Sequence, residues 1–447
     1  MRVHAFVDEG LGHSSYVLDL GDGTAAVVDP PRFPADHERL ADTHGLRLAW
    51  TLDTHSHADY VTGSPALADL GSVFIAPAAS NLATAHRAVI DGQHVALATG
   101  VQLTALATPG HTPDHHAYLV GSEGRPVALF TGGSLMVGAV GRTDLCGPEL
   151  AEPLAHEMFR SLRRFDDLPD DLAVYPTHGA GSFCSAPGAT ERTTTLGRER
   201  ATNRLFAIRD ETAFVEELLE GFGTFPTYFS RLPELNRLGP RRYDTIPFLP
   251  KLGVVEVDRH LETGGIVIDV RPIARFAAGH LPGSVSNALR PVFASWLGWL
   301  IDPSRPVVFV LDAHQDRGEL VRQCLDVGHE RITGELDGGI DAWTGSGRGV
   351  AAIPLTVPDK IEGTVVDVRQ ANEYIGGHLP GARNVELGSI ATAVLPDVMV
   401  TLMCGHGERA MTAASLLSRR GHRHVRVLDG GPETWAAATG QPLLAGQ

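Results

Sequence analysis

The stretch Thr54–Tyr60 (Thr-His-Ser-His-Ala-Asp-Tyr) follows the apolar run 48–52 (Leu-Ala-Trp-Thr-Leu). The run predicts a strand that delivers the polar cluster onto a loop at its carboxyl end. Residues i and i+2 of extended backbone share a face, so His55, His57 and Asp59 can converge on one cation. Imidazole and carboxylate are ligands of zinc, iron and manganese. A polar loop with solvated histidines is the other interpretation of this stretch taken alone.

The composition is that of a soluble globular protein with several domains. The chain has 447 residues, 43% hydrophobic and 20% charged, and at roughly 150 residues per domain this predicts about three domains. The net charge of −16 argues against nucleic acid or an anionic membrane as a partner. The amino terminus lacks the apolar core of a signal peptide, and no apolar run approaches the ~20 residues of a membrane helix.

The four cysteines are widely scattered and form no C-x-x-C pair; they are Cys146, Cys184, Cys324 and Cys404. This pattern is neither a disulfide framework nor a zinc ribbon. We therefore expect a cytoplasmic chain with reduced thiols.

Short β-rich runs alternate with Gly, Pro and Asp turns in the first part of the chain. The predicted strands include residues 15–18, 25–28, 73–76 and 127–130. Apolar residues at spacings of three and four predict a helix over 154–168. These elements predict a mixed α/β domain with many strands.

Two further histidines lie on turns that follow apolar runs. His111 stands in the turn 108–113 and His178 in the turn 175–179. A single histidine of this kind is more often structural. Three histidine loops at strand ends favour a metal site, because such sites collect ligands from several strand ends.

The order of these motifs resembles the metallo-β-lactamase superfamily. The matching elements are His55-x-His57-x-Asp59, Gly110-His111-Thr112, the Thr-Gly turn at 131–132 and His178-Gly179. Residues 141–144 (Gly-Arg-Thr-Asp), following 131–135, resemble the persulfide dioxygenases of that superfamily. The segments 225–231 and 235–237 are similar to the tail that joins such domains to rhodanese modules. The resemblance covers roughly residues 1–240 and implies an αββα sandwich.

Two residues depart from the superfamily pattern. Tyr60 stands where the superfamily commonly has a histidine, and Gly133 stands where it has a metal-ligating aspartate. The iron site of the dioxygenases has two histidines and one carboxylate. His55 and His111 match the histidines, whereas Gly133 cannot supply the carboxylate.

The resemblance then implies a metal centre assembled from the remaining ligands. The metal-ligand set predicted for this chain comprises His55, His57, His111, Asp59 and His178. His57 would complete a three-histidine site, and Asp59 with His178 would be the remnant of the second site of binuclear relatives. Asp114 is a weaker candidate and more typical of a turn cap. We expect one mononuclear metal per chain, with Fe(II) favoured over Zn(II).

Cys184 lies six residues after His178. It could lie beside the metal or serve as a packing residue, and packing is the interpretation that we favour from the sequence.

An internal repeat begins at about residue 255. The matched pairs of segments are 266–271 with 365–369, 279–284 with 377–382, and 336–339 with 428–431. Both repeats resemble rhodanese domains, which implies small parallel sheets flanked by helices. The expected domains are residues 1–240 with the linker tail, residues 250–350 and residues 351–447.

The second repeat carries a cysteine at a strand-to-helix turn. Cys404 follows the apolar run 398–403 and precedes the helical stretch 410–417. Free backbone N–H groups and the helix dipole, together with Arg409, lower a thiol pKa and stabilise a thiolate or persulfide. The Cys-x4-Arg spacing resembles a sulfurtransferase. The expected substrate-binding loop comprises Gly405, His406, Gly407 and Glu408.

The first repeat lacks the corresponding cysteine. Asp312 stands at its position, and Arg317 stands at the arginine position. A carboxylate cannot accept a sulfane sulfur. We expect this degenerate domain to be a spacer, a docking surface or a binding pocket.

These resemblances imply a persulfide-handling enzyme of sulfide and sulfane-sulfur metabolism. The first domain would oxidise a glutathione or coenzyme A type persulfide to sulfite with O2, and Cys404 would exchange sulfane sulfur with thiosulfate. Arg142 is the candidate anion contact in the first domain. The alternatives are a zinc-dependent thioester hydrolase resembling glyoxalase II, or a sulfurtransferase whose first domain is catalytically inactive. A homodimer is an assembly open to this chain.

Overall fold

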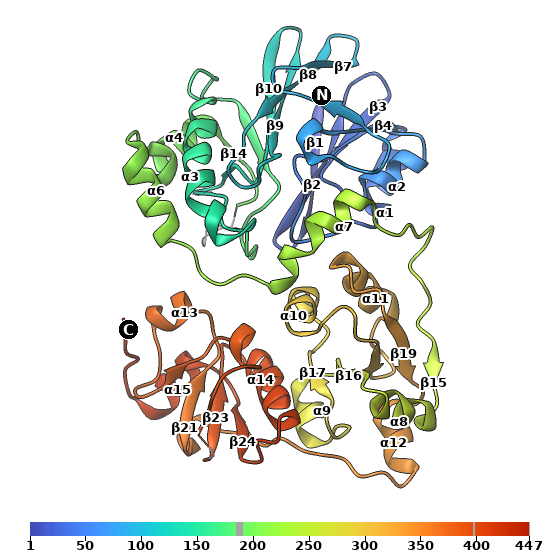
Figure 1. The fold of residues 1–447 in the computed structure, drawn as a ribbon, viewed down its shortest axis with the longest axis vertical. Helices are drawn as coiled ribbons and strands as arrows, with labels where there is room; N and C mark the ends of the chain where they lie inside the picture. Colours follow the sequence, from blue (N-terminus) through green and yellow to red (C-terminus); the bar gives the residue numbers. More distant parts are fainter. Residues whose placement is uncertain (185–190, 397, 447) are drawn as a thin grey trace. The chain divides into compact units, whose positions relative to one another are not determined.

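A computed structural model describes residues 1–184, 191–396 and 398–446. The chain forms two compact units (Figure 1). The first comprises Met1–Thr245 with Leu325–Gly328, and the second comprises Ile246–Cys324 with His329–Gln447. None of the helices in the described ranges has the length and apolar character of a membrane span.

The first unit contains two six-stranded sheets of mixed strand direction. The strands of the first sheet, in spatial order, are β1 (Arg2–Asp8), β2 (His13–Asp19), β3 (Thr24–Val28), β4 (Arg47–Leu52), β5 (Val73–Pro77) and β6 (Arg87–Val89). Those of the second are β14 (Thr194–Thr195), β13 (Ala173–Pro176), β10 (Arg125–Gly132), β9 (His116–Ser122), β8 (Val101–Ala107) and β7 (His94–Ala98). A small antiparallel pair is formed by β11 (Leu135–Met136) and β12 (Ala139–Val140).

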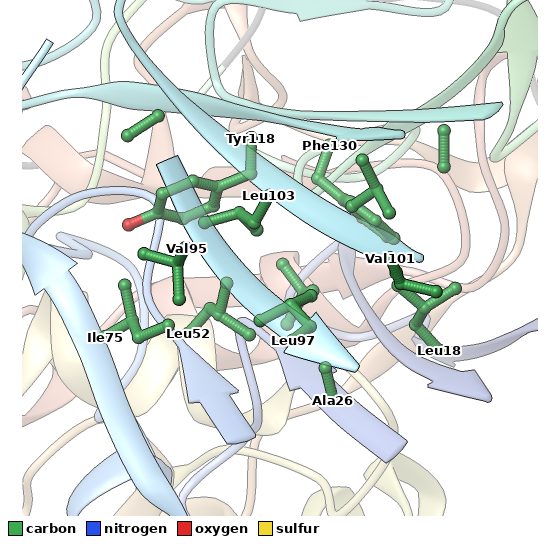
Figure 2. Close-up of a cluster of buried hydrophobic side chains, with 14 of the residues drawn as sticks. Leu18, Ala26, Leu52, Ile75, Val95, Leu97, Val101, Leu103, Tyr118 and Phe130 are labelled. Atoms are coloured by element: carbon green, nitrogen blue, oxygen red, sulfur yellow. The ribbon is translucent and has the colours of Figure 1, made fainter. Parts of the chain in front are cut away.

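Alternating side chains of both sheets form the core between them. Tyr16 and Leu18 of β2 point into this core, whereas Val17 between them packs on the outer face of its sheet. In the second sheet, Tyr118 and Phe130 face the same core (Figure 2). The period-two pattern therefore buries both faces of each sheet, one against the other sheet and one against helices.

Helices cover the two outer faces of this sandwich. Apolar side chains of α3 and α6 pack on the second sheet, and α1 and α2 lie against the first (Figure 1). The helices are α1 (Ala35–His44), α2 (Ser64–Asp69), α3 (Pro148–Arg163), α4 (Leu196–Thr202), α5 (Arg204–Ala207), α6 (Glu211–Glu220) and α7 (Leu232–Leu238), with short 3-10 helices η1 (Ala78–Ser80) and η2 (Thr227–Ser230). The predicted helix over 154–168 is displaced. It begins at Pro148, because proline fits the first helical turn, and it ends at Arg163.

The second unit contains two parallel five-stranded sheets with the same strand order. The first repeat comprises β15 (Lys251–Leu252), α8 (Val254–Glu262), β16 (Ile266–Asp269), α9 (Ile273–Ala278), β17 (Val285–Ser286), α10 (Phe293–Leu300), β18 (Val307–Val310), α11 (Arg317–Asp326), β19 (Ile332–Leu336) and α12 (Gly339–Gly345). The second comprises β20 (Leu355–Thr356), η3 (Pro358–Lys360), β21 (Thr364–Asp367), α13 (Ala371–Gly376), β22 (Arg383–Asn384), η4 (Leu387–Ser389), β23 (Val400–Met403), α14 (Glu408–Arg419), β24 (Val425–Leu428) and α15 (Pro432–Thr439). The sheet orders are β15-β19-β18-β16-β17 and β20-β24-β23-β21-β22.

The expected fold class is confirmed, with an αββα sandwich followed by two small parallel-sheet domains. The division at residues 240 and 350 stays a prediction, and Gln447 at the end of the third expected domain lies outside the described residues.

Truncation of Phe130 tests the core between the two sheets of the first unit. Its ring is 1% exposed and packs against Tyr16 and Tyr175. Phe130→Ala should lower the free energy of unfolding by about 3–5 kcal/mol, because the neighbouring side chains only partly fill the cavity that the missing ring leaves. The measurement is urea unfolding of the transition that involves the first unit. Val127→Ala on the same strand is the control, since Val127 is 37% exposed; equal losses in both variants would contradict the assignment.

Candidate functional site

The loops that carry the predicted histidines meet where strands of both sheets of the first unit end. Residues 53–60 follow β4 and residues 108–115 join β8 to β9. Gly133 follows β10 and His178 follows β13. Ser14 N–H donates to Thr177 O at 2.7 Å, which joins the start of β2 to the loop of His178. The site therefore belongs to one edge of the sandwich.

A buried carboxylate, Asp29, connects these loops from the end of β3. It accepts hydrogen bonds from Thr54 N at 2.7 Å, from Thr54 Oγ1 at 2.8 Å and from Thr177 Oγ1. His57 Nε2 lies 3.1 Å from the same carboxylate. Burial favours the neutral acid, but His57 and the hydrogen-bond donors outweigh it and lower the pKa of Asp29. Sequence reasoning missed Asp29; its signal was an acid between an apolar strand and Pro30.

Two hydrogen bonds and one ion-pair contact indicate where the protons of three histidines lie. The Thr54 hydroxyl donates to Asp29, so it accepts a proton from His55 Nδ1 at 2.8 Å. His111 Nδ1 donates to the carbonyl of Arg142 at 2.9 Å. His178 Nδ1 lies 3.2 Å from the Asp59 carboxylate. Each neutral ring therefore carries its proton on Nδ1 and leaves a lone pair on Nε2.

These lone pairs face one another in a buried space. His178 Nε2 and His55 Nε2 are 3.3 Å apart, and no group in the described part of the chain hydrogen-bonds to the buried Nε2 of His111. Burial holds the pKa of His55 well below its usual value and lowers that of His111 to about 3. Two acceptors this close repel each other unless a cation lies between them. The donor set therefore fits a divalent transition metal.

His57 offers a further nitrogen to this cluster. The possible ligand atoms of His55, His57 and His178 all lie within 4.8 Å of one another. Burial lowers the pKa of His57, but the Asp29 carboxylate outweighs it and raises the pKa. Tyr60 stacks on the His57 ring with centroids 4.4 Å apart, and its hydroxyl donates to Asp29 O at 3.3 Å. Tyr60 therefore packs against the face of the His57 ring and helps to hold it in place.

The His111 ring leaves no room for a side chain at Gly133, the position for which the resemblance implies a ligating aspartate. A β-carbon on Gly133 would lie 2.3 Å from Cδ2 of His111. Gly133 N–H donates to His115 Nε2 at 3.0 Å, and His115 Nδ1 donates to Thr108 Oγ1 at 2.8 Å. His115, which sequence reasoning also missed, is thus a neutral support of this turn.

Two other polar residues considered from the sequence are engaged elsewhere. The Asp114 carboxylate accepts from Ser56 Oγ at 2.7 Å and Ser80 Oγ at 2.5 Å, so it ties loops together. Arg142 Nε and Nη2 donate to Asp144 at 2.6 and 2.8 Å. Its role as an anion contact stays a prediction, while its carbonyl orients His111.

Cys184 is fully buried beside the histidines. Its sulfur and ligand nitrogens of His111 and His178 all lie within 4.8 Å of one another. The sequence had favoured a packing role for this residue. The fold brings it beside the histidine cluster through the loop that follows His178, and its role stays a prediction.

Side chains of the tail after α6 bind backbone carbonyls of the loop that carries His57. Asn236 Nδ2 donates to the carbonyls of His57 and Tyr60, both at 2.9 Å, and Tyr228 OH donates to Asp59 O at 3.2 Å. This tail is therefore part of the support of the site and not only a connection.

In the second unit, Cys404 lies between β23 and α14. Its side chain is 1% exposed, and Sγ accepts the backbone N–H of Gly407 at 3.1 Å. Gly407 adopts a φ of 98°, a backbone conformation that glycine adopts without steric strain. His406 is exposed at the tip of the loop. A thiolate or persulfide at Cys404 would accept a hydrogen bond from this N–H. It would also lie at the amino-terminal, positive end of the dipole of a 12-residue helix.

Arg409 is held in place by a carboxylate of α13. Its Nη1 and Nη2 donate to the two oxygens of Glu373 at 2.6 and 2.8 Å. Burial lowers the pKa of the guanidinium, but Glu373 and, to a smaller extent, Cys404 outweigh it and raise the pKa. A fixed positive charge is thus positioned for a sulfur anion.

The corresponding loop of the first repeat is built differently. Arg317 donates to the carbonyls of Asp312, Ala313 and Gln315 and pairs with Glu335 at 2.8 Å. Gln315 Oε1 accepts the Asp312 N–H at 2.9 Å. Arg317 and the Asp312 N–H therefore bond within their own loop and to Glu335, whereas Arg409 is held by Glu373 of α13, outside the cysteine loop.

The comparisons with known proteins cover both units. A model of the rhodanese-like domain matches residues 254–346 and 357–438. A hydroxyacylglutathione hydrolase of Halorhodospira halophila is 32% identical over 231 residues, which are 49% of this chain and 82% of that protein. The mitochondrial persulfide dioxygenase of Homo sapiens is 30% identical over 186 residues, which are 40% of this chain and 68% of that protein. A crystal structure named metallo-β-lactamase, from Staphylococcus aureus subsp. aureus COL, has a TM-score of 0.67 and 26% identity, and covers 75% of this chain and 98% of that chain.

The chain is a metallo-β-lactamase-fold protein with two rhodanese-like domains. The resemblance expected from the motifs is confirmed. The metallo-β-lactamase-fold unit belongs to the family of enzymes that includes the hydrolase and the dioxygenase above.

Replacement of Asp29 tests the support of the metal centre. Asp29→Asn keeps the size and suits the φ of 50°, but its amide places a donor where the carboxylate accepts. We expect Zn(II) affinity to fall by about 10–100-fold, as for other outer partners of ligating histidines. The measurement is competition with a chelator, and Asp22→Asn on an exposed turn is the matched control. Unchanged affinity in Asp29→Asn would contradict this role.

Proposed function

We propose that the chain oxidises the outer sulfur of a small-thiol persulfide in its first unit and transfers sulfane sulfur through Cys404. The observation that carries the proposal is the presence, in one chain, of a buried histidine cluster with free Nε2 lone pairs and a cysteine held by a loop N–H. The likeness to a persulfide dioxygenase and to rhodanese-like domains supports it. The expected substrates are glutathione or coenzyme A type persulfides and O2.

The first unit would bind the metal through His55, His111 and His178, with His57 beside them. A bound Fe(II) ion supplies the one-electron chemistry that O2 requires. The residues of the chain orient the imidazoles and exclude bulk water, since all four histidines are at most 2% exposed. Overall, RSSH, O2 and water give RSH, sulfite and two protons.

The second repeat would use Cys404 as the sulfur acceptor and donor. Its thiolate attacks the outer sulfur of thiosulfate, releases sulfite and becomes a persulfide, which then passes the sulfur to a thiol or cyanide. The same exchange in reverse forms thiosulfate from sulfite and a persulfide. The Gly407 N–H and Arg409 would stabilise the anionic sulfur. Joining the two activities in one chain raises the effective concentration of each product at the next site.

Oxygen uptake tests the first activity. The iron-loaded full chain should consume O2 with glutathione persulfide, and His111→Ala should lose this uptake because a ligand nitrogen is removed. His94→Ala on the exposed strand β7 should behave as the wild type. Absence of uptake at full iron occupancy would rule the oxidation out.

Sulfur transfer from thiosulfate to cyanide tests the second activity. Cys404→Ser should fall to the uncatalysed background, because the serine hydroxyl cannot carry a sulfane sulfur. The control is Cys146→Ser, whose side chain is exposed. Retained transfer in Cys404→Ser would overturn the role of this residue.

A zinc-dependent thioester hydrolase is the second candidate for the first unit. It is favoured by the similarity to a hydroxyacylglutathione hydrolase over 82% of that protein. A metal-activated water would attack the thioester carbonyl. Hydrolysis of a glutathione thioester by the zinc-loaded chain, without oxygen uptake by the iron-loaded chain, would decide for this candidate.

A further inference from the structure

Gly133 lies against the His111 ring of the first unit and has no side chain that could supply an anionic metal ligand. The His111 ring closes against Gly133, and a β-carbon there would lie 2.3 Å from it. The three atoms nearest to that β-carbon all belong to the His111 ring, which the bond between its Nδ1 and Arg142 O holds in place. His55, His57, His111 and His178 are neutral donors as metal ligands, so these imidazoles leave a divalent ion with its full charge. The carboxylate of Asp59, which the sequence placed in the ligand set, faces Nδ1 of His178, whereas Nε2 of that ring faces His55.

Cys184 lies where it can compensate for this loss. It is fully buried, and its sulfur lies within 4.8 Å of ligand nitrogens of both His111 and His178. The His111 residue is 1% exposed, and its Nε2 has no hydrogen-bond partner in the described part of the chain. A buried sulfur therefore lies within 4.8 Å of a nitrogen on each of two imidazoles, and one of these, His111, also carries the unsatisfied Nε2.

Backbone hydrogen bonds of Arg142 position both Cys184 and His111. Arg142 N–H donates to Cys184 O at 3.1 Å, while Arg142 O accepts the Nδ1 proton of His111 at 2.9 Å. Arg142 Nη1 also donates to Phe183 O at 3.1 Å. One residue thus positions both groups, as the supporting partners of metal ligands do.

We propose that Cys184 is a metal ligand and supplies, as a thiolate, the negative charge that is missing at Gly133. The ligand set on this side of the centre is then His111, His178 and Cys184. Thiolate and imidazole together suit zinc and also bind iron. The inference rests on the proposed function only in requiring that the first unit binds a metal.

X-ray absorption of the zinc-loaded full chain tests this ligand directly. We expect one sulfur at about 2.3 Å beside nitrogen or oxygen ligands at about 2.0–2.1 Å. Cys184→Ser should lose the sulfur contribution, and its Zn(II) affinity should fall by more than the roughly 10–100-fold that loss of a supporting partner costs. Cys146→Ser is the matched control, because it removes an exposed thiol from the same unit.

Two results would overturn the inference. One is a wild-type spectrum with nitrogen and oxygen ligands only, which would leave Cys184 as a thiol packed beside Asp59. The other is a sulfur contribution that persists in Cys184→Ser, which would assign the metal to another cysteine. If Cys184→Ser does not fold by circular dichroism, Cys184→Asp takes its place. It should retain zinc without sulfur, because a carboxylate also supplies the negative charge.

The outcome is separable from that of the proposed oxidation. A zinc–sulfur distance without oxygen uptake by the iron-loaded chain supports the ligand and removes the oxidation. Oxygen uptake with a sulfur-free metal site does the reverse. A chain that binds no metal removes both.

Discussion

The hydrogen bonds of the buried Asp29 carboxylate organise the histidine site of the first unit. They reach Thr54, His57 and Thr177, which belong to loops at the ends of two different sheets. Thr54 Oγ1, which donates to the same carboxylate, accepts a hydrogen bond from His55 Nδ1. The Arg142 carbonyl and the Asp59 carboxylate face Nδ1 of the other two histidines, His111 and His178. The buried charge of Asp29 thereby sets the proton positions of His55 and His57.

The second unit shows how the same fold keeps or loses a sulfur site. In the second repeat, Glu373 on α13 holds Arg409 beside the cysteine loop, and the Gly407 N–H remains directed at Cys404. In the first repeat, Arg317 turns onto the carbonyls of its own loop and Glu335. The strand order is identical in both. The difference is therefore in which partner the arginine finds, and not in the architecture.

The fold and the motifs of this chain could be read from its sequence because they depend on local pattern. Short apolar runs between turn residues identify strands such as 25–28 and 127–130, and the repeated segments after residue 255 identify two copies of one domain. Histidines at strand ends and a cysteine between a strand and a helix are equally local features. Each follows from side-chain periodicity and from the residues that turns and helix ends require.

The contacts that make these residues a site could not be read in this way. The partners of Asp29, His115 and Cys184 cannot be identified from the sequence, because they lie far away along the chain. The closure of His111 against Gly133 is likewise a property of packing. The residue pattern therefore predicts a mixed α/β domain, the two repeats and the candidate ligands, and the family resemblance adds the two-sheet sandwich. Only the tertiary structure decides which atoms face the metal, because proton positions and ligand distances are set by hydrogen bonds between segments that folding brings together.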